Sequence, residues 1–203
     1  MKQYNIDQDK WGQKLLEFVQ TAVDSVRPSS RLLQDSMNFN NFIKIKIINW
    51  RDNSKSAYIN GVVMNKNIAD KRMISTIQNP SILLLKESIG TMKNDGLGGS
   101  AGLTEIQSIV DQEEHWIEII RQKLTQVKPN IIIVEKDVGY KILDALRESQ
   151  ITVISNMNHH KMKRIQRFTQ TIISPSYNVI DKSFVLGKCK QFRVEAPFTG
   201  GQL

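Results

Sequence analysis

The sequence predicts an α/β protein in which a β-hairpin or sandwich portion is joined to a portion built on a largely parallel sheet. Two short segments, 82–85 (ILLL) and 131–134 (IIIV), are continuously apolar, which is typical of strands covered on both faces. From the second segment onward, helical patterns alternate with strands, and this order favours right-handed crossovers with helices packed on the sheet. Earlier in the chain, Ile43, Ile45 and Ile47 alternate with lysines, which predicts a strand with one solvated face.

The first part of the chain predicts a helix, a connector and a hairpin. Apolar residues recur at every third or fourth position over 11–26, and an Arg-Pro pair then stops the pattern. The polar stretch 28–41 has no sustained period and is expected to be a connector. The turn-forming sequence RDNSKS leads from the strand at 43–47 to a second strand expected at 58–64, which together predict a hairpin.

The second half of the chain carries the parallel portion. A Gly-rich connection at 94–102 precedes a long helix, which Thr104 opens with Gln107 at the spacing of a capping box. Its expected buried stripe is Ile106, Val110, Ile117, Ile120, Leu124 and Val127. The elements expected next are a helix at 138–148, a strand at 151–154, a helix at 158–169 and a short strand at 171–173. We therefore expect a helical arm and connector over 1–40, a domain over 41–193 and a frayed tail over 194–203.

The composition is that of a globular protein with a basic excess. The 203 residues carry 28 Lys and Arg against 20 Asp and Glu, a formal charge of +8, and 40% of them are hydrophobic. These values exclude collagen-like, disulfide-scaffold and wholly disordered chains. A single cysteine and a start without an apolar secretory stretch favour a reducing compartment. The longest apolar runs are far shorter than the roughly 18 residues that a membrane-spanning helix needs.

The motifs that would carry catalysis or metal binding are weak. The glycines of 94–102 could cradle a phosphate, but no Lys-Ser/Thr pair follows them and the preceding strand ends too early, so a surface loop is expected. The adjacent His159 and His160 would point about 100° apart on a helix and so do not face one ion. Cys189 lies between two lysines, which would lower the pKa of an exposed thiol, although a small buried packing residue is the favoured interpretation. We expect no cofactor and no metal.

Enzyme function remains an open alternative at one place in the sequence. Glu135 and Asp137 follow the second buried strand, at the carboxyl end where open α/β sheets bind ligands, so a small Rossmann-like enzyme stays a hypothesis. The long helix carries four further carboxylates, Asp111, Glu113, Glu114 and Glu118. Acid–base catalysis needs surroundings that shift the pKa values of such groups, so a solvated acidic face is the simpler interpretation. No catalytic residue is predicted.

Charge is segregated along the chain, and this is its most informative feature. Residues 94–120 contain six acids and no Lys or Arg, whereas residues 149–180 contain no acid. The second stretch carries Lys161, Lys163, Arg164 and Arg167 on one predicted helix, with Met162, Ile165 and Phe168 as its inward stripe. The helix is therefore expected to present a cationic ridge. Such a ridge suits an acidic protein surface or phosphoinositide headgroups. Nucleic acid is disfavoured, because aromatic residues that could stack on bases are sparse there. A basic face that only keeps the protein soluble is a further alternative.

Several sequence runs resemble one known family. The segment YINGVVMNKNIADKRMISTIQNPSILLL, the VEK tripeptide at 134–136, the basic run around Arg164 and the LGKC turn at 186–189 resemble the chaperonin-like domain of the PIKfyve-type phosphatidylinositol 3-phosphate 5-kinases. The match covers about residues 40–193, and a looser similarity extends to the apical domain of group II chaperonins. A kinase catalytic segment, the zinc-binding cysteine cluster of these kinases and the ATP-binding motifs of chaperonins are missing from the sequence.

The resemblance implies a chaperonin apical-domain-like fold in which two exposed helices, here 107–127 and 158–169, form a groove. It implies a non-catalytic protein-interaction domain that docks a regulatory scaffold protein and a phosphoinositide phosphatase, in a cytoplasmic kinase at endosomal membranes. The expected partner-binding residues are Lys161, Lys163, Arg164 and Arg167 on the basic helix and Asp111, Glu114 and Glu118 on the acidic helix. Peripheral contact of the ridge with an anionic membrane is a variant. The alternative is a chaperonin-type domain that binds non-native polypeptides.

Overall fold

The computed structural model describes residues 8–25, 42–47, 56–90 and 103–195, with side chains from residue 11 onward in the first range and from residue 112 onward in the last. The chain divides into two compact units, one formed by Met1–Val63 with Ala196–Leu203 and one formed by Met64–Glu195. The second unit contains every strand of the described residues. No helix in these ranges is long and apolar enough to cross a lipid bilayer.

The first unit contains the predicted amphipathic helix, α1 (Gln8–Ser25). The described residues of 43–47 and 58–64 have no strand structure, so the two strands expected there are not formed. Ile45 and Ile47 are 83% and 89% exposed, so no face of the alternating segment is covered. An isolated two-stranded hairpin is at best marginally stable, which explains why alternation alone did not produce one. The expected connector at 28–41 lies outside the described residues.

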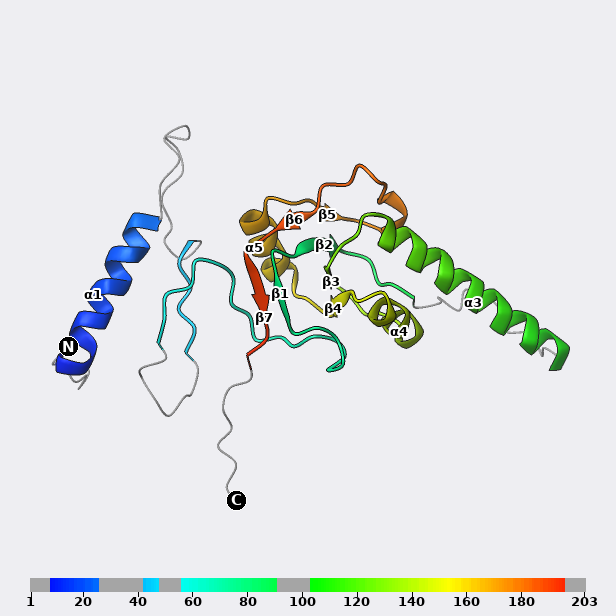
Figure 1. Ribbon diagram of the computed structural model, residues 1–203, viewed down its shortest axis with the longest axis horizontal. Helices are drawn as coiled ribbons and strands as arrows, with labels where there is room; N and C mark the ends of the chain where they lie inside the picture. Colours follow the sequence, from blue (N-terminus) through cyan, green and yellow to red (C-terminus); the bar gives the residue numbers. More distant parts are fainter. Residues whose placement is uncertain (1–7, 26–41, 48–55, 91–102, 196–203) are drawn as a thin grey trace, which may run out of the picture. The chain divides into compact units, whose positions relative to one another are not determined.

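The second unit is built on the predicted parallel sheet (Figure 1). Its parallel strands are β2 (Ser81–Leu85), β3 (Ile131–Val134), β4 (Thr152–Ile154) and β5 (Ile173–Ser174), in the order β4-β3-β2-β5. Ile82 lies opposite Ile131, and Leu84 lies opposite Ile173 on the other side of β2. Each residue of β3 and the last four of β2 are buried, as continuously apolar strands require.

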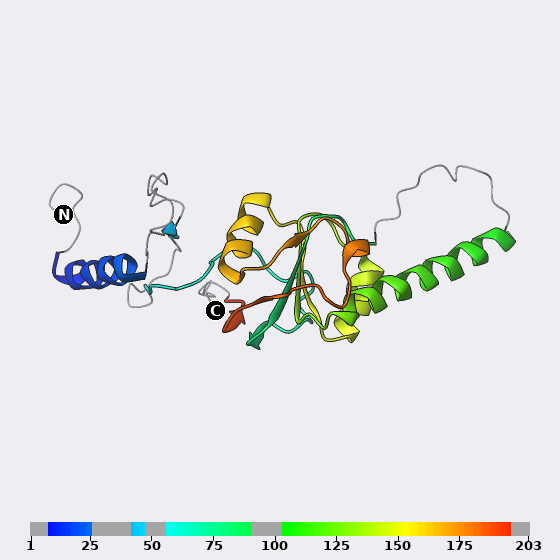
Figure 2. The same cartoon turned by 90° about the horizontal axis from the view of Figure 1, so that it is seen from above.

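Three helices connect these strands, and the strand order decides which face each one covers. From β2 the chain adds β3 and then β4 on one side, and it then crosses back over the sheet to place β5 on the other side of β2. Right-handed crossovers therefore place α3 (Leu103–Gln126) and α4 (Tyr140–Glu148) on one face and α5 (His159–Thr169) on the other (Figure 2). α3 and α4 pack against each other, whereas α5 packs against β2 and β6 (Gly187–Lys188), which is antiparallel to β2.

The antiparallel portion of the fold lies elsewhere than the sequence indicated. β1 (Thr76–Gln78) pairs with β7 (Gln191–Arg193), two segments more than a hundred residues apart in the chain. The backbone N–H of Asn79 donates to Lys190 at 2.8 Å, and that of Val194 donates to Ser75 at 2.9 Å, which extends the ladder at both ends. A short 3₁₀ helix, η3 (Tyr177–Val179), follows β5.

The free edge of β4 is sealed by the segment that precedes β1. The hydroxyl of Thr152 donates to the carbonyl of Ile74 at 2.8 Å, and the N–H of Ala69 donates to the carbonyl of Val153 at 2.8 Å. The N–H of Val153 also lies 3.2 Å from the sulfur of Met73, which is buried. Covering an edge in this way prevents the strand from pairing with another chain.

Two glycines allow the segments that follow β2 and β3 to meet. Ile89 and Val138 form a parallel bridge, and the N–H of Gly139 donates to the carbonyl of Ile89 at 2.7 Å. A Cβ atom on Gly139 would overlap the carbonyl oxygen of Gly90, and Gly90 itself has a φ of 74°, which favours glycine. This junction holds the carboxyl ends of the two central strands together.

We expect Gly139→Ala to destabilise the second unit by about 1–3 kcal/mol, because the added methyl group forces two backbone segments apart. Urea denaturation followed by circular dichroism measures the change. The matched control is Gly12→Ala in α1, where no atom lies within 4 Å of the added Cβ. An unchanged midpoint for Gly139→Ala would show that the junction is not rigid.

Candidate functional site

The basic helix α5 is amphipathic, and its inward face differs by one residue from the prediction. Met162 and Ile165 are buried as expected, but the third inward position is Thr169, whose hydroxyl donates to the carbonyl of Ile165 at 2.8 Å. Phe168 is 44% exposed. The prediction was wrong there because a strict three-residue spacing drifts off one face of a helix that has 3.6 residues per turn.

The outward face of α5 is the cationic ridge, formed by Lys161, Lys163, Arg164 and Arg167. Lys163 and Arg167 are exposed, and Lys161 and Arg164 are half-buried. Within the described ranges no ion pair joins Lys161, Lys163 or Arg164 to a carboxylate. The strands that pack against α5, β2 and β6, contain no acid either. The structure thus forms the ridge, while its partner-binding role stays a prediction.

The start of α5 is fixed by local polar contacts. The side chain of Asn158 caps the helix by accepting from the N–H of His160 at 2.9 Å. His159 Nδ1 lies 3.1 Å from the carboxylate of Glu135, which follows β3. The imidazole rings of His159 and His160 lie edge to face, with their centroids 6.4 Å apart. Among the described residues, no group of three or more His, Cys, Asp and Glu side chains is placed to hold a metal ion.

The acidic helix α3 is partly neutralised by cations of its own chain. Glu118 accepts two hydrogen bonds from Arg121, both at 2.7 Å, and one from Gln122 at 2.9 Å. The hydrogen bonds from Arg121 lower the pKa of Glu118 to about 2. Glu114 is exposed, and the side chain of Asp111 lies outside the described residues. Glu118 is therefore engaged locally, which the sequence-based assignment of it as a partner-binding residue did not anticipate.

The groove predicted between the acidic and basic helices is not formed. α3 and α5 lie on opposite faces of the sheet (Figure 2). Glu114 and Glu118 on α3 are therefore not brought together with Lys163 and Arg164 on α5. The sequence identified both helices correctly but gave no strand order, and only the return from β4 to β5 reveals that the helices are separated.

The structure forms a different groove, between α3 and α4. We call it the α3–α4 groove; it is a hollow of about 290 Å³ bounded by Trp116, Ile117, Tyr140 and Ile142 together with Glu113, Lys141 and the two glycines of the strand junction. It lies beyond the carboxyl ends of β2 and β3, because those glycines, Gly90 and Gly139, follow these strands. An ion pair of 2.7 Å between Lys141 and Glu113 joins the two helices across it.

The chemistry of the α3–α4 groove is that of a contact surface. Its walls carry two aromatic side chains, and Tyr140 is 71% exposed. Aromatic residues beside a few charged groups are typical of the centre of protein–protein interfaces. Sequence reasoning missed this groove; the available signals were the aromatic residues Trp116 and Tyr140 on neighbouring helices of the predicted fold.

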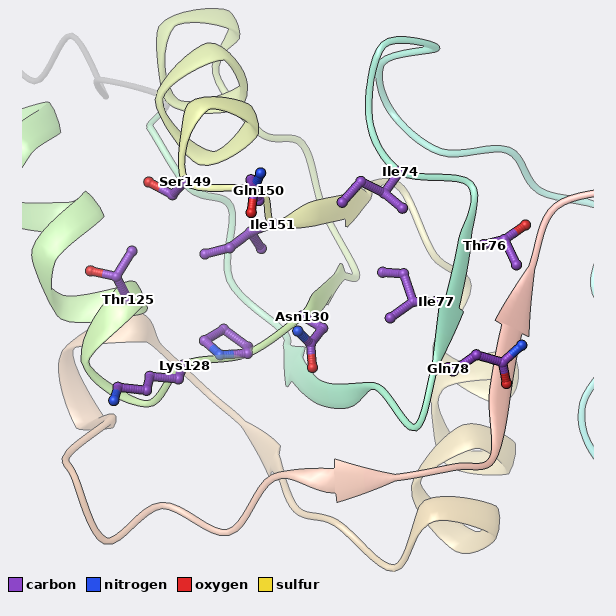
Figure 3. Close-up of a pocket in the computed structure, with 11 residues that line it drawn as sticks. Ile74, Thr76, Ile77, Gln78, Thr125, Lys128, Asn130, Ser149, Gln150 and Ile151 are labelled. Carbon is purple, nitrogen blue, oxygen red and sulfur yellow. The ribbon is translucent and has the colours of Figure 1, made fainter.

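A second hollow, of about 500 Å³, lies at the amino end of β3 and β4 (Figure 3). Ile74, Ile77 and Ile151 line it, together with polar side chains of which Asn130 and Ser149 make hydrogen bonds within the fold. Asn130 accepts a hydrogen bond from the N–H of Ser81 at 2.9 Å, and the hydroxyl of Ser149 donates to Ala145 at 3.0 Å. This end of an α/β sheet is opposite to the one where ligands usually bind.

The residues considered for catalysis are occupied in other ways. Asp137 accepts a hydrogen bond from Asn156 at 2.6 Å, and Glu135 pairs with His159. Burial raises the pKa of the Cys189 thiol, which disfavours the reactive thiolate, and its sulfur lies 3.5 Å from the carbonyl of Gln191. The Gly-rich segment 94–102 lies outside the described residues.

A parallel sheet sealed at β4 is flanked by α3 and α4 on one face and by α5 on the other, and the similar proteins identify this arrangement as a domain of chaperonin apical type. The chain belongs to the TCP-1/cpn60 chaperonin family, whose model matches residues 6–199. A solved structure described as an open-state monomer of a group II chaperonin from Methanococcoides burtonii has the same fold, with a TM-score of 0.62 at 16% identity over 90% of this chain and 39% of that one.

Within this class the chain is similar to lipid kinases, which confirms the resemblance found in the sequence. The human 1-phosphatidylinositol 3-phosphate 5-kinase is 34% identical to it over 185 residues, which are 91% of this chain and 9% of the kinase. The T-complex protein 1 subunit gamma of Tetrahymena pyriformis is 23% identical over 188 residues, 92% of this chain and 34% of that subunit. The chain thus spans about a tenth of the length of the kinase relatives it matches.

The pairing of Glu118 with Arg121 predicts an acid-sensitive contact on α3. In the folded chain we expect the Glu118 carboxyl to titrate with a pKa of about 2, so that the pair favours folding above about pH 4.5 and loses that contribution as the pH falls towards 2. Carboxyl ¹³C NMR measures the midpoint. Arg121→Gln should move the pKa of Glu118 back towards its ordinary value, and an unchanged midpoint in this variant would contradict the assignment.

Proposed function

We propose that the chain is a non-catalytic protein-docking domain, of chaperonin apical type, that works as part of a phosphatidylinositol 3-phosphate 5-kinase. The family of its relatives supports the kinase context. The observation that carries the docking role is the α3–α4 groove, an aromatic-walled hollow at the carboxyl end of the sheet with one ion pair across it. Glu135 and Asp137, the carboxylates at the carboxyl end of β3, are held by His159 and Asn156, and we assign phosphorylation of the lipid to other parts of such a kinase.

The proposed partners are a regulatory scaffold protein and a phosphoinositide phosphatase, and the proposed place of action is the cytoplasmic side of endosomal membranes. The groove suits a partner that inserts an apolar side chain between Trp116 and Tyr140 and places polar groups near the Glu113–Lys141 pair. Because Tyr140 is largely exposed, its contribution to the fold is small and its contribution to binding can be measured separately.

Tyr140→Ala is therefore expected to weaken binding of the scaffold protein by about tenfold or more, as truncation of an aromatic residue at the centre of an interface does. Isothermal titration calorimetry or pull-down with the purified scaffold measures the affinity. The matched control is Val179→Ala, a truncation of an exposed side chain on η3 outside the groove, which should bind as the wild type does. Equal binding of Tyr140→Ala and wild type would remove the groove from the docking surface.

A charge-reversed variant of the ridge separates the two faces of the sheet. Lys163→Glu combined with Arg164→Glu leaves the α3–α4 groove intact, so we expect it to retain scaffold binding. Loss of binding in this variant, with an unchanged circular dichroism spectrum, would move the docking surface to α5 and contradict the assignment to the groove.

A second candidate function is the holding of non-native polypeptides, which the solvent-exposed apolar side chains on the α3–α4 face favour. Ile119 and Tyr140 are exposed on this face, and Trp116 is half-buried. If this function is correct, the chain suppresses aggregation of a chemically denatured test protein, measured by light scattering, and Tyr140→Ala suppresses it less. Unchanged scattering at several-fold excess of the chain would exclude this candidate.

A further inference from the structure

The far end of α5 combines cations with exposed apolar side chains, a feature that protein docking at the α3–α4 groove does not use. Phe168 on the last turn of α5, Ile172 just after it and Val185 before β6 are 44%, 61% and 63% exposed. Large apolar side chains scattered singly on a surface need no explanation, but a group of them beside one helix end marks an interaction site.

Two contacts hold the segment before β6 against the end of α5 and the turn that follows it. Gln170 ends α5 in the left-handed conformation, with a φ of 53°, so the chain turns between Phe168 and Ile172. The hydroxyl of Thr171 donates to the carbonyl of Val185 at 2.9 Å, which holds the second segment against this turn. Gly187 lies so near Thr169 that a Cβ atom on the glycine would come within 2.7 Å of the Thr169 hydroxyl.

Cations surround the apolar group. At 100° per residue, Lys163, Arg164 and Arg167 point away from the buried Met162, and Phe168 lies beside Arg164 at the margin of this outward face. No acid occurs between residues 149 and 180, so α5 and the turn that follows it carry no carboxylate of their own.

We propose that this end of α5 docks on an anionic lipid bilayer, with Phe168, Ile172 and Val185 entering the interface and Lys163, Arg164 and Arg167 contacting lipid headgroups. The combination of aromatic and aliphatic side chains with surrounding lysines and arginines is the chemistry of peripheral membrane binding, in which apolar burial and attraction to anionic lipid add together. An acidic protein surface satisfies the cations but leaves the three apolar side chains without a partner. The proposal is independent of the docking function of the α3–α4 groove.

The test is sedimentation of the full 203-residue chain with vesicles of phosphatidylcholine, with and without phosphatidylserine, at low and high salt. We expect binding to the vesicles that contain phosphatidylserine, weakened by salt because the attraction between exposed charges is screened. Lys163→Glu combined with Arg164→Glu should lower the partition coefficient by about tenfold or more. The matched control reverses the same charge at Lys71 and Lys128, which are exposed away from α5, and should bind normally.

The apolar part of the patch is tested in the same assay. Phe168→Ser should weaken binding, whereas Ile119→Ser, which removes an exposed apolar side chain from α3, should not. In Phe168→Trp, the indole emission should shift to shorter wavelength on vesicles and be quenched by brominated lipid. Circular dichroism verifies that each variant is folded.

Three outcomes would overturn docking on the membrane, and a fourth would overturn the insertion of the apolar side chains. The first is equal sedimentation with and without phosphatidylserine, and the second is unchanged binding in the charge-reversed variant. The third is retention of the chain on immobilised polyglutamate without binding to any vesicle, which would identify the ridge as a contact for acidic protein. Vesicle binding without a shift of the Phe168→Trp emission would overturn the insertion of the apolar side chains.

Discussion

The parallel pairing of β2 with β3 is the interaction on which the rest of the second unit depends. The two strands are buried and apolar throughout their paired residues, from Ile82 opposite Ile131 to Leu85 opposite Val134. Truncating one such side chain to alanine costs about 2–5 kcal/mol, a large share of the 5–15 kcal/mol by which domains are typically stable. The same pairing brings Gly90 and Gly139 together beyond the strand ends, and these glycines form one wall of the α3–α4 groove.

The order of the strands then separates two surfaces of different chemistry. One face carries α3 and α4, with an aromatic hollow and two α3 carboxylates, Glu113 and Glu118, that pair with cations of the same chain. The other carries α5, whose lysines and arginines have no acid on the strands beneath them. The sheet between the faces keeps these charges apart, so that each face can engage a separate partner. Docking of protein on one side and of membrane on the other is compatible with this arrangement.

The sequence predicted the parallel portion well because its signals are local. Uninterrupted apolar runs marked β2 and β3, and the amphipathic pattern marked α5. Two features depended on contacts between distant segments and were missed. Alternating isoleucines at 43–47 did not form a strand, whereas the antiparallel pair joined β1 to β7 across more than a hundred residues. The groove that the family resemblance implied between the charged helices is not formed either, because the strand order places the two helices on opposite faces of the sheet.

Hydrogen–deuterium exchange, read by mass spectrometry, tests the separation of the two faces most directly. The chain is compared alone, with the scaffold protein and with vesicles that contain phosphatidylserine. The account predicts that the scaffold slows exchange in α3 and α4 around Trp116 and Tyr140, and that vesicles slow it in α5 and the turn at Gln170. Protection of the same helices by both partners would contradict the account.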